Sequence, residues 1–271
     1  MSNKEFDRKD VDRYLYEVAK LYKKQNRNTN AEAEIIIVGG AAMLLRYNFR
    51  DTTMDIDAVI RASSSFKDAV NCVGDTFGLP NGWINSEFRK TVSYSDKLIE
   101  HSKYYKKFCN VLSVRLIEAE YLLAMKMISA RLYKKDMSDI VGIIKEHEEL
   151  GTPITFEKID FAVHELYGGW DKIDSGVINY VKTVLECDDL ESLYYDIVDE
   201  EKLNRRILIE ADEKYPDAMN NDNAESFLMS FKKKSGSERE SVIDKLRQNQ
   251  ERVSGAISEN VNVKENREQQ K

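Results

Sequence analysis

The spacing of apolar positions in the first sixty residues predicts helix, strand, helix and strand, in that order. Residues 7–25 carry apolar side chains three and four positions apart, which is the period of an amphipathic helix. Residues 35–38 form a short β-branched run, typical of a strand that is buried on both faces. Helix-forming residues at 41–46 predict a second helix, and residues 54–60 alternate apolar and acidic side chains, which predicts a second strand.

Beyond these elements the pattern changes from mixed to helical. Residues 65–77 predict a helix, whereas 83–110 predicts only a short helix near 85–89 and strands near 91–95 and 110–115. From there to about residue 215 the period is helical, with glycine and proline between the segments. The helices predicted there lie near residues 117–133, 137–149, 155–167, 174–186 and 189–214.

The change of period divides the chain into three predicted parts. Residues 1–115 predict an α+β domain with a small mixed β-sheet and flanking helices, and 116–215 predict an α-helical bundle domain. Residues 216–271 form a polar tail that we expect to be partly helical or disordered, because no aromatic residue occurs after Phe231. Ser237-Glu238-Arg239-Glu240 fits a capping box and predicts one exposed helix in this tail.

Composition and charge exclude several classes of protein. The formal net charge of −7 argues against a protein that coats nucleic acid by bulk attraction, although a local basic patch could still bind phosphate. Cysteines and histidines show neither CxxC nor HExxH spacing, so no zinc site or disulfide framework is indicated. No apolar stretch approaches the length of a membrane span and the start is polar, so we expect a cytoplasmic protein without a membrane partner.

Two carboxylates stand two positions apart on the second predicted strand. Asp55 and Asp57 would point to the same face, roughly 6.5 Å apart along the strand at ~3.3 Å per residue. Carboxylates held this close repel one another, and a divalent cation between them relieves the repulsion. Mg²⁺, or Mn²⁺ in its place, favours carboxylate oxygens together with the phosphates of a substrate. The pair therefore predicts a metal site that positions and neutralises a triphosphate.

A glycine pair precedes the acidic pair, between the buried strand and the following helix. Gly39 and Gly40 lack side chains, so their backbone amides could approach a phosphate closely at the positive end of that helix. Each feature alone is common: Gly-Gly occurs in many turns, and an exposed Asp-x-Asp is usually solvated. Together, in this order, they predict one phosphate- and metal-binding pocket.

These residues resemble the signature of the DNA-polymerase-β-like nucleotidyltransferase superfamily. Val38-Gly39-Gly40 followed by Asp55-Ile56-Asp57-Ala58 is similar to its Gly-Gly or Gly-Ser turn and its acidic–hydrophobic–acidic strand. Arg50 and Thr53 match the Arg-x-Thr-x-Asp lead-in of small bacterial members, among them the AbiEii-like toxins of toxin–antitoxin and abortive-infection systems. The resemblance implies a nucleotidyltransferase core in residues 1–115, with Gly39, Gly40, Arg50 and Thr53 as substrate-binding residues.

The same group has a helical lysine and a Lys-Asp-x-x-Asp motif. Lys126 and Lys135-Asp136-Met137-Ser138-Asp139 match these residue by residue, which implies catalytic roles for Lys126 and Asp139 beside Asp55 and Asp57. We expect their helices to fold back across the mouth of the acidic pocket. A structural explanation exists for each residue: Lys126 could extend past a core face, Asp136 could cap a helix, and Asp139 could favour the helix dipole.

One departure from the superfamily concerns a third carboxylate on a further strand. The candidate strand at 110–115 carries none, although Asp96 and Glu100 lie just before it. The metal site could therefore be completed by Asp139 or be incomplete. A basic and aromatic cluster from Lys97 to Arg115 could bind single-stranded nucleic acid, but a packed tyrosine surface with a solvated charged face is the slightly favoured interpretation.

We predict a metal-dependent nucleotidyltransferase that moves a nucleoside monophosphate from an NTP to a hydroxyl of RNA, for example tRNA, or of a protein. The resemblance implies a toxin or phage-defence role with a cognate antitoxin as a partner. The alternative is a catalytically inactive nucleotidyltransferase fold that serves as a binding or regulatory module, which the missing strand carboxylate favours. Retention of Asp55, Asp57 and the glycine pair favours the enzyme.

Overall fold

The computed structural model describes residues 4–27, 31–215, 220 and 223–234, which form two compact units. Unit 1 comprises Met1–Ser129 and Glu146–Lys172, and unit 2 comprises Ala130–Lys145 and Ile173–Lys271, each as far as it is described. Within the described ranges, no helix combines the length and the apolar character needed to cross a bilayer. The predicted α+β fold is confirmed, whereas the predicted domain bounds at 115 and 215 stay predictions.

Unit 1 is built on a five-stranded mixed sheet with the order β3-β2-β1-β5-β4. Its strands are β1 (Ala33–Ile37), β2 (Ile56–Arg61), β3 (Ile84–Asn85), β4 (Ser102–Phe108) and β5 (Leu112–Ile117). β1 is antiparallel to β2 and parallel to β5, β2 is parallel to β3, and β4 is antiparallel to β5. The central strand is the β-branched run of the sequence, and its Ile35, Ile36 and Ile37 are fully buried.

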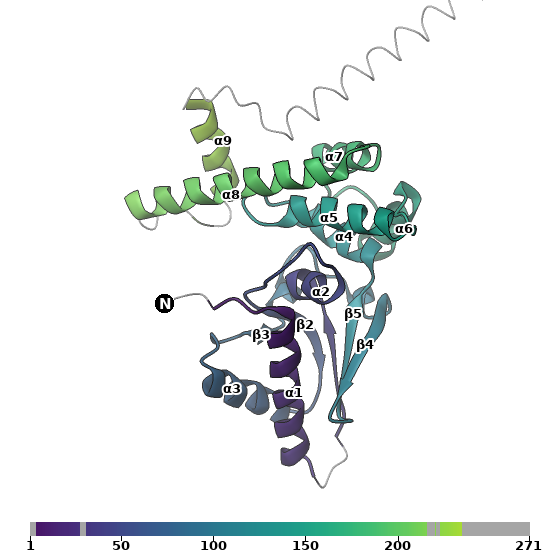
Figure 1. Cartoon of the computed structure of the whole chain (residues 1–271), viewed down its shortest axis with the longest axis vertical. Coiled ribbons are helices and arrows are strands. Elements are labelled where there is room, and N and C mark those ends of the chain that lie inside the picture. The colour runs from purple at the N-terminus through teal and green to yellow at the C-terminus, as the bar shows by residue number, and fades with distance from the viewer. Residues whose placement is uncertain (1–3, 28–30, 216–219, 221–222, 235–271) are drawn as a thin grey trace, which may run out of the picture. The chain divides into compact units, whose positions relative to one another are not determined.

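Two helices of unit 1, α1 (Arg8–Gln25) and α3 (Ser65–Phe77), pack against each other beside the sheet (Figure 1). The first turn of α1 is held by a capping box between Asp7 and Asp10. α3 ends at Gly78, whose left-handed φ of 62° closes the helix at little steric cost. Trp83 is buried between these helices and the sheet, where its indole N–H donates to the carbonyl of Val70 at 3.2 Å.

The remaining helices of unit 1 lie where the sequence predicts them. They are α2 (Gly39–Arg46), α4 (Ala119–Ser129) and α6 (Phe156–Tyr167), with α4 packed against α6. α4 ends at Ser129, four residues before the predicted residue 133. α2 begins two residues earlier than the composition predicts, at Gly39 itself. The short helix expected near 85–89 is a 3₁₀ turn, Glu87–Lys90, and a second such turn spans Asp96–Ile99.

One expectation for residues 83–110 is wrong. No strand forms at 91–95, where Val92 is 69% exposed, because the backbone folds into turns in which Thr91 N donates to Phe88 O at 2.9 Å and Tyr94 N to Thr91 O at 3.2 Å. The sequence pattern also gave no indication of the edge strand β4, which residues 102–108 of the basic and aromatic cluster form. The capping box predicted at Ser237 lies outside the described residues.

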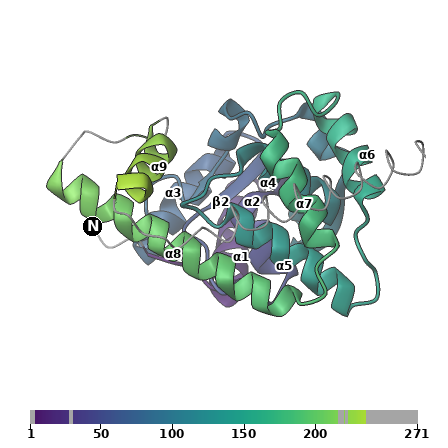
Figure 2. The ribbon, with the colours of Figure 1, turned by 90° about the horizontal axis from the view of Figure 1, so that it is seen from above.

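Unit 2 contains most of α5 (Asp136–Glu149), together with α7 (Ser175–Leu185), α8 (Leu190–Lys214) and α9 (Ala224–Lys234). α9, which the sequence pattern did not predict, contacts α8 and rises steeply from it in Figure 1, and Figure 2 shows it beside the C-terminal half of α8. The buried face of α8 carries Glu201, a carboxyl group that accepts hydrogen bonds from Met137 N at 3.0 Å and Ser138 N at 3.1 Å. Burial raises the pKa of Glu201 to about 8.

Candidate functional site

The candidate site lies at the edge of the sheet where β1 ends and β2 begins. Ile37, the last residue of β1, pairs with Ala58 of β2, so Val38 stands opposite Asp57. A hydrogen bond of 2.9 Å from Val38 N to the carbonyl of Asp57 continues this pairing past the assigned end of β1. The antiparallel register therefore brings the glycine pair and the acidic pair to the same edge.

Asp55 and Asp57 are both accessible, while the residue between them is not. Asp57 is a half-buried residue of β2, Asp55 is exposed, and Ile56 is fully buried. Asp55 stands one residue before the first residue of β2, so the expectation that both carboxylates lie within the strand holds for Asp57 only. The alternation of exposure across the three residues matches the predicted placement of the acidic pair on one side.

Gly39 lies directly beneath the carboxylate of Asp57. A Cβ atom built on Gly39 would stand 3.6 Å from Asp57 Oδ2, which is ordinary van der Waals contact. The backbone of Gly39 has φ +59°, a left-handed conformation that side chains disfavour. Glycine is therefore required here by the backbone, and Asp57 points over the start of α2.

Gly40 serves a different purpose, since it leaves room for the side chains of Arg50 and Thr53. A Cβ atom on Gly40 would meet Arg50 Nη2 at 2.7 Å and Thr53 Oγ1 at 3.1 Å. The guanidinium group of Arg50 thus lies against the first turn of α2, beside the threonine. The four predicted substrate-binding residues, Gly39, Gly40, Arg50 and Thr53, are brought together around this turn.

The start of α2 is electrostatically suited to an anion. Its N-cap residue is Val38, whose side chain cannot accept a hydrogen bond, and its first turn contains no acidic residue. The first amides of a helix have no carbonyl partner within it, and the helix dipole adds partial positive charge at this end. With the Arg50 guanidinium alongside, this turn presents positive charge next to the carboxylate of Asp57.

The strand next to Asp57 is β3, and it carries an amide side chain, that of Asn85, where the superfamily pattern would favour a third carboxylate. Asn85 of β3 pairs in register with Asp57, and its side-chain oxygen accepts a hydrogen bond of 2.8 Å from Glu87 N. The candidate strand examined in the sequence, now β5, adjoins β1 instead of β2. Asp96 lies in a 3₁₀ turn and accepts a hydrogen bond from the hydroxyl of Tyr94 at 2.5 Å. The strand order, which sequence reasoning did not supply, identifies Asn85 as the neighbour of Asp57.

The two aspartates of the Lys-Asp-x-x-Asp motif are buried, whereas its Lys135 is exposed. Asp136 is fully buried and accepts bonds from Arg131 N at 3.2 Å and Arg131 Nε at 2.8 Å, so it holds the start of α5. Asp139 is 2% exposed in α5 of unit 2, and Lys126 is 9% exposed in α4 of unit 1. The catalytic roles of Lys126 and Asp139 stay predictions.

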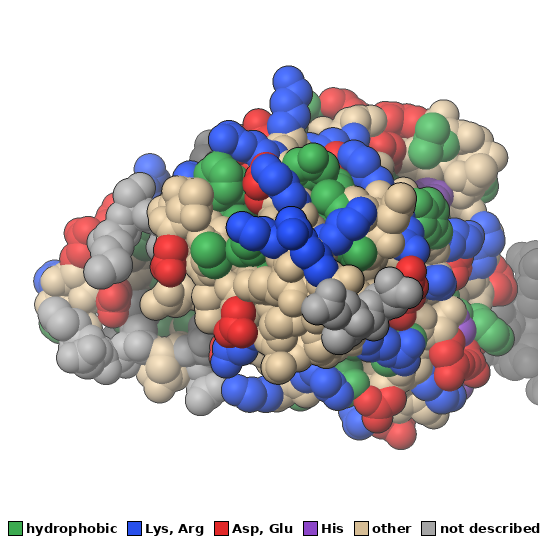
Figure 3. Space-filling view, turned by 90° about the horizontal axis from the view of Figure 1, so that it is seen from below, with side chains coloured by type: hydrophobic (Ala, Val, Ile, Leu, Met, Phe, Trp, Pro, Cys, Tyr) green, Lys and Arg blue, Asp and Glu red, His purple; other side chains and the backbone are tan. Residues whose placement is uncertain are grey.

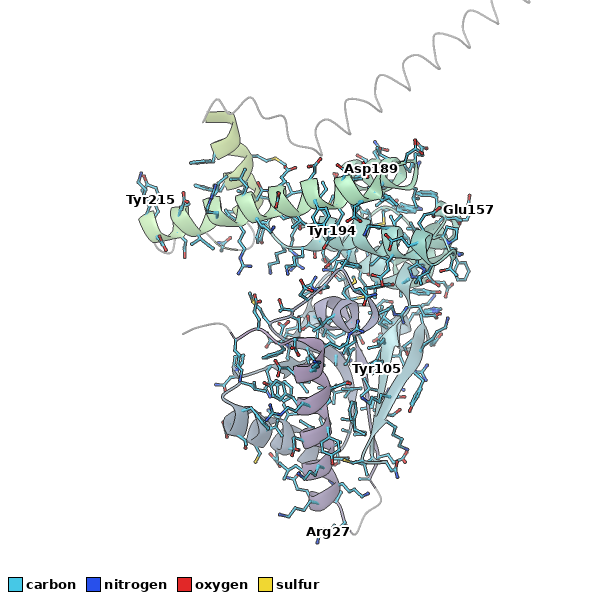
Figure 4. The ribbon with its side chains drawn as sticks, viewed as in Figure 1. Arg27, Tyr105, Glu157, Asp189, Tyr194 and Tyr215 are labelled. Atoms are coloured by element: carbon cyan, nitrogen blue, oxygen red, sulfur yellow. The ribbon has the colours of Figure 1, made fainter. Side chains whose placement is uncertain are left out.

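The basic and aromatic cluster forms ion pairs along β4. Lys103 pairs with Glu118 at 2.5 Å, Lys106 with Asp12 at 2.8 Å, and Lys107 with Glu32 at 2.9 Å. Tyr105, labelled in Figure 4, reaches from β4 to Asp12 of α1, to which its hydroxyl donates at 3.1 Å. These contacts agree with the favoured interpretation of this segment as a charged, packed surface.

A second basic surface lies at the C-terminal end of α1. Lys20, Lys23 and Lys24 belong to the last turns of α1, and Arg27, labelled at the lower end of Figure 4, follows them. Figure 3, a view from below, shows lysine and arginine side chains gathered there among hydrophobic ones. Cations at this end of a helix complement its dipole. The surface lies where β1 begins, at the opposite edge of the sheet from the site.

The donor set fits a metal ion that arrives with a nucleotide. Among the described residues, no group of three or more histidine, cysteine and acidic side chains could hold a metal ion by itself. The oxygens of Asp55 and Asp57 are nevertheless the ligands that Mg²⁺ prefers, and Mg²⁺ commonly takes one or two carboxylates plus substrate phosphates. A carboxylate pair next to an electropositive helix start suits that combination.

A helix that starts at two glycines beside an acidic strand, on a small mixed sheet, is the arrangement expected of a nucleotidyltransferase. The chain belongs to a family described as nucleotidyltransferases of unknown function (DUF6036), whose model matches residues 13–165. Neither a curated protein nor a solved structure matches the chain. The matched segment contains Gly39, Gly40, Arg50, Asp55 and Asp57.

Proposed function

We propose that the protein transfers a nucleoside monophosphate from an NTP to a hydroxyl group, with Mg²⁺ or Mn²⁺ held by Asp55 and Asp57. The observation that carries the proposal is the position of Asp57 Oδ2 over the glycine start of α2, with Arg50 against the next residue of the same turn. A helix start suited to an anion and a carboxylate suited to a divalent cation thus stand side by side. A triphosphate carrying a divalent cation needs both of these at once.

The residues of the site divide the work on the triphosphate. The backbone amides of Gly39 and Gly40 would bind a phosphate oxygen, and the Arg50 guanidinium would bind a second one through its planar pair of donors. Thr53 donates its hydroxyl hydrogen to the carbonyl of Asp55 at 3.0 Å and so fixes the backbone at the acidic pair. Arg50 and the helix start bind charge, while Thr53 maintains geometry.

In the reaction, the acceptor oxygen would attack the α-phosphorus, the bond from that phosphorus to the bridging oxygen would break with pyrophosphate leaving, and the proton of the acceptor hydroxyl would pass to water. The bound metal would neutralise the triphosphate and stabilise the attacking and leaving oxygens. Asp55 and Asp57 would hold the metal ion in place from the start of β2. Lys126 is proposed as a further phosphate contact and Asp139 as a further acidic residue, by their match to the toxin-type motif.

The acceptor is proposed to be RNA, for example tRNA, or a protein side chain, and the biological role to be growth arrest or phage defence with a cognate antitoxin. These proposals rest on the resemblance of Arg50, Thr53 and the Lys-Asp-x-x-Asp motif to AbiEii-like toxins. The identity of the neighbouring gene tests the role, because a small adjacent antitoxin-like reading frame is expected.

The acceptor is tested by incubating the protein with each α-labelled NTP and Mg²⁺, in the presence of total RNA or of total cell protein. Label should enter one acceptor class with one preferred NTP, and EDTA should abolish the transfer. Binding of Mg²⁺–NTP without transfer to either class would favour the alternative, a catalytically inactive module. Absence of both binding and transfer would contradict the proposed site itself.

A further inference from the structure

Asp55 lies outside strand β2, yet its backbone is fixed on both sides. The hydroxyl of Thr53 donates to the Asp55 carbonyl at 3.0 Å, and Ile56 N donates to the carbonyl of Trp83 at 2.7 Å. The loop that precedes it, residues 47–53, carries Arg50. The position of both Asp55 and Arg50 therefore depends on what holds this loop.

The N-terminal segment binds the end of the loop through its backbone. Phe6 and Thr53 form an isolated antiparallel bridge, with Phe6 N donating to Thr53 O at 2.7 Å and Thr53 N donating to Phe6 O at 3.0 Å. Beside this bridge, the Thr52 hydroxyl donates to Glu5 Oε2 at 2.8 Å. Figure 1 shows the segment running past β2 and β3 before α1 begins.

The ring of Phe6 packs in the core next to the bridge. Phe6 is fully buried and meets Trp83 edge to face, with ring centroids 6.4 Å apart, and Tyr14 in the same manner at 5.8 Å. Trp83 is the residue whose carbonyl binds Ile56 N. The side chain of Phe6 therefore contacts Trp83, whose carbonyl holds Ile56. The backbone of the same residue, Phe6, holds Thr53.

Arg8, the first residue of α1, binds the beginning of the same loop. Its Nε donates to the carbonyl of Leu44 at 3.0 Å and its Nη2 to the carbonyl of Tyr47 at 2.9 Å, at the C-terminal end of α2. A guanidinium group on the last carbonyls of a helix satisfies acceptors that have no partner in the helix. Residues 5–8 therefore contact the loop at both of its ends.

We propose that residues 5–8 form a clamp that positions Arg50 and Asp55 for binding of the triphosphate and its metal ion, with Arg8 and Phe6 as positioning residues. The inference rests on the proposed function and extends it to a segment outside the matched family region, which starts at residue 13. Neither residue touches the ligand. Their effect reaches it through Tyr47 at one end of the loop and Thr53 at the other.

Arg8→Ala tests the clamp with little risk to the fold, and Arg13→Ala is its matched control. Arg13 is on the same helix, but its guanidinium lies over the ring of Phe77, 4.7 Å from the centroid, away from the loop. Two probes are used. Binding of inorganic tripolyphosphate with Mg²⁺ is measured by calorimetry, and binding of Mn²⁺ alone is measured by electron paramagnetic resonance. Hydrogen exchange of peptides covering residues 47–57 reports the order of the loop without any ligand.

Arg8→Ala should weaken tripolyphosphate binding by about tenfold, since it removes two hydrogen bonds that hold the loop. It should also speed exchange in residues 47–57, whereas Arg13→Ala should change neither. Arg8→Lys, which keeps one donor, should recover part of the affinity. Equal affinities of the Arg8→Ala and Arg13→Ala proteins would overturn the proposal, and so would unchanged exchange in the loop.

Phe6→Ala provides the second arm, with Phe66→Ala as its control. Phe66 is as deeply buried, but it packs on Tyr22 at the other end of α1, with centroids 5.6 Å apart. At matched loss of melting temperature, only Phe6→Ala should weaken Mn²⁺ binding, and equal weakening would overturn the clamp. If the wild-type protein binds neither probe, the proposed function fails. If it binds both probes and Arg50→Ala abolishes tripolyphosphate binding, the proposed function stands. The Arg8 and Phe6 variants then test only the clamp.

Discussion

Replacement of Gly40 by alanine separates the stability of α2 from its ability to bind phosphate. Alanine is favoured over glycine inside a helix by about 0.5–1 kcal/mol. The added Cβ would stand 2.7 Å from Arg50 Nη2, so something must move, and the movable atom is the end of a flexible side chain. Displacing Arg50 loses its weak 3.4 Å bond to the carbonyl of Thr52, worth about 0.5–1 kcal/mol. The free energy of unfolding should therefore change by less than about 1 kcal/mol.

Ligand binding should respond much more strongly than stability. If the Arg50 guanidinium binds a phosphate oxygen, its displacement removes a hydrogen bond between charged groups, worth about 1.5–3 kcal/mol. The dissociation constant for Mg²⁺–NTP should then rise by about ten- to a hundredfold. Gly39→Ala should behave differently: its Cβ makes only ordinary contact with Asp57 Oδ2, but its φ of +59° costs a side chain about 1–2 kcal/mol of stability.

Calorimetric titration with Mg²⁺–NTP and urea unfolding of both variants measure the two quantities. A double-mutant cycle with Arg50→Ala identifies the cause, because Gly40→Ala should add almost nothing once the arginine is absent. Wild-type affinity in a folded Gly40→Ala protein would refute the assignment of Arg50 to the phosphate. A further tenfold loss in the Arg50→Ala background would show that the added methyl group blocks the site directly.

Two further predictions concern unit 2. Burial raises the pKa of Glu201 from 4.5 to about 8, so the stability it contributes is complete below the ordinary glutamate pKa and is lost as the pH rises toward 8. Glu201→Gln keeps an acceptor for Met137 N and Ser138 N, so it should flatten the fall in unfolding free energy between these two pH values. Urea unfolding across this pH range measures the fall, and equal slopes of unfolding free energy against pH in the variant and the wild-type protein would contradict the prediction. Asp136→Ala should cost about 2 kcal/mol, because it leaves Arg131 without its buried partner, and chemical denaturation with no such loss would exclude this structural role.

The helices could be predicted from the sequence because their apolar periods are long and end at turn residues. The boundaries of α3 match the expected 65–77, and α8 starts within one residue of the expected position. β4 escaped notice because it is an edge strand whose exposed positions carry lysine and tyrosine. Lysines protect such edges from pairing with other chains, and they also hide the period of two.

The centre of the site could be predicted, but its supports could not. The residue types of Gly39, Gly40, Asp55 and Asp57 indicated one pocket, and the antiparallel pairing of β1 with β2 brings the two pairs to the same end of the sheet. The contacts of Arg8 with Tyr47 and of Phe6 with Thr53 join residues about forty positions apart, and no local pattern indicates them. The neighbour of Asp57 depends on strand order, which apolar periodicity does not encode.

Paired transfer reactions with α-labelled and γ-labelled NTP, using the wild-type protein and Asp57→Asn, test the central claim most directly. The account predicts that Mg²⁺ and the wild-type protein carry α-label, but not γ-label, into the acceptor with release of pyrophosphate. Asp57→Asn should lose most of this transfer while keeping its unfolding free energy, because the acidic pair repels itself when no metal is bound. Transfer of γ-label, or full α-label transfer by a folded Asp57→Asn protein, would contradict the account.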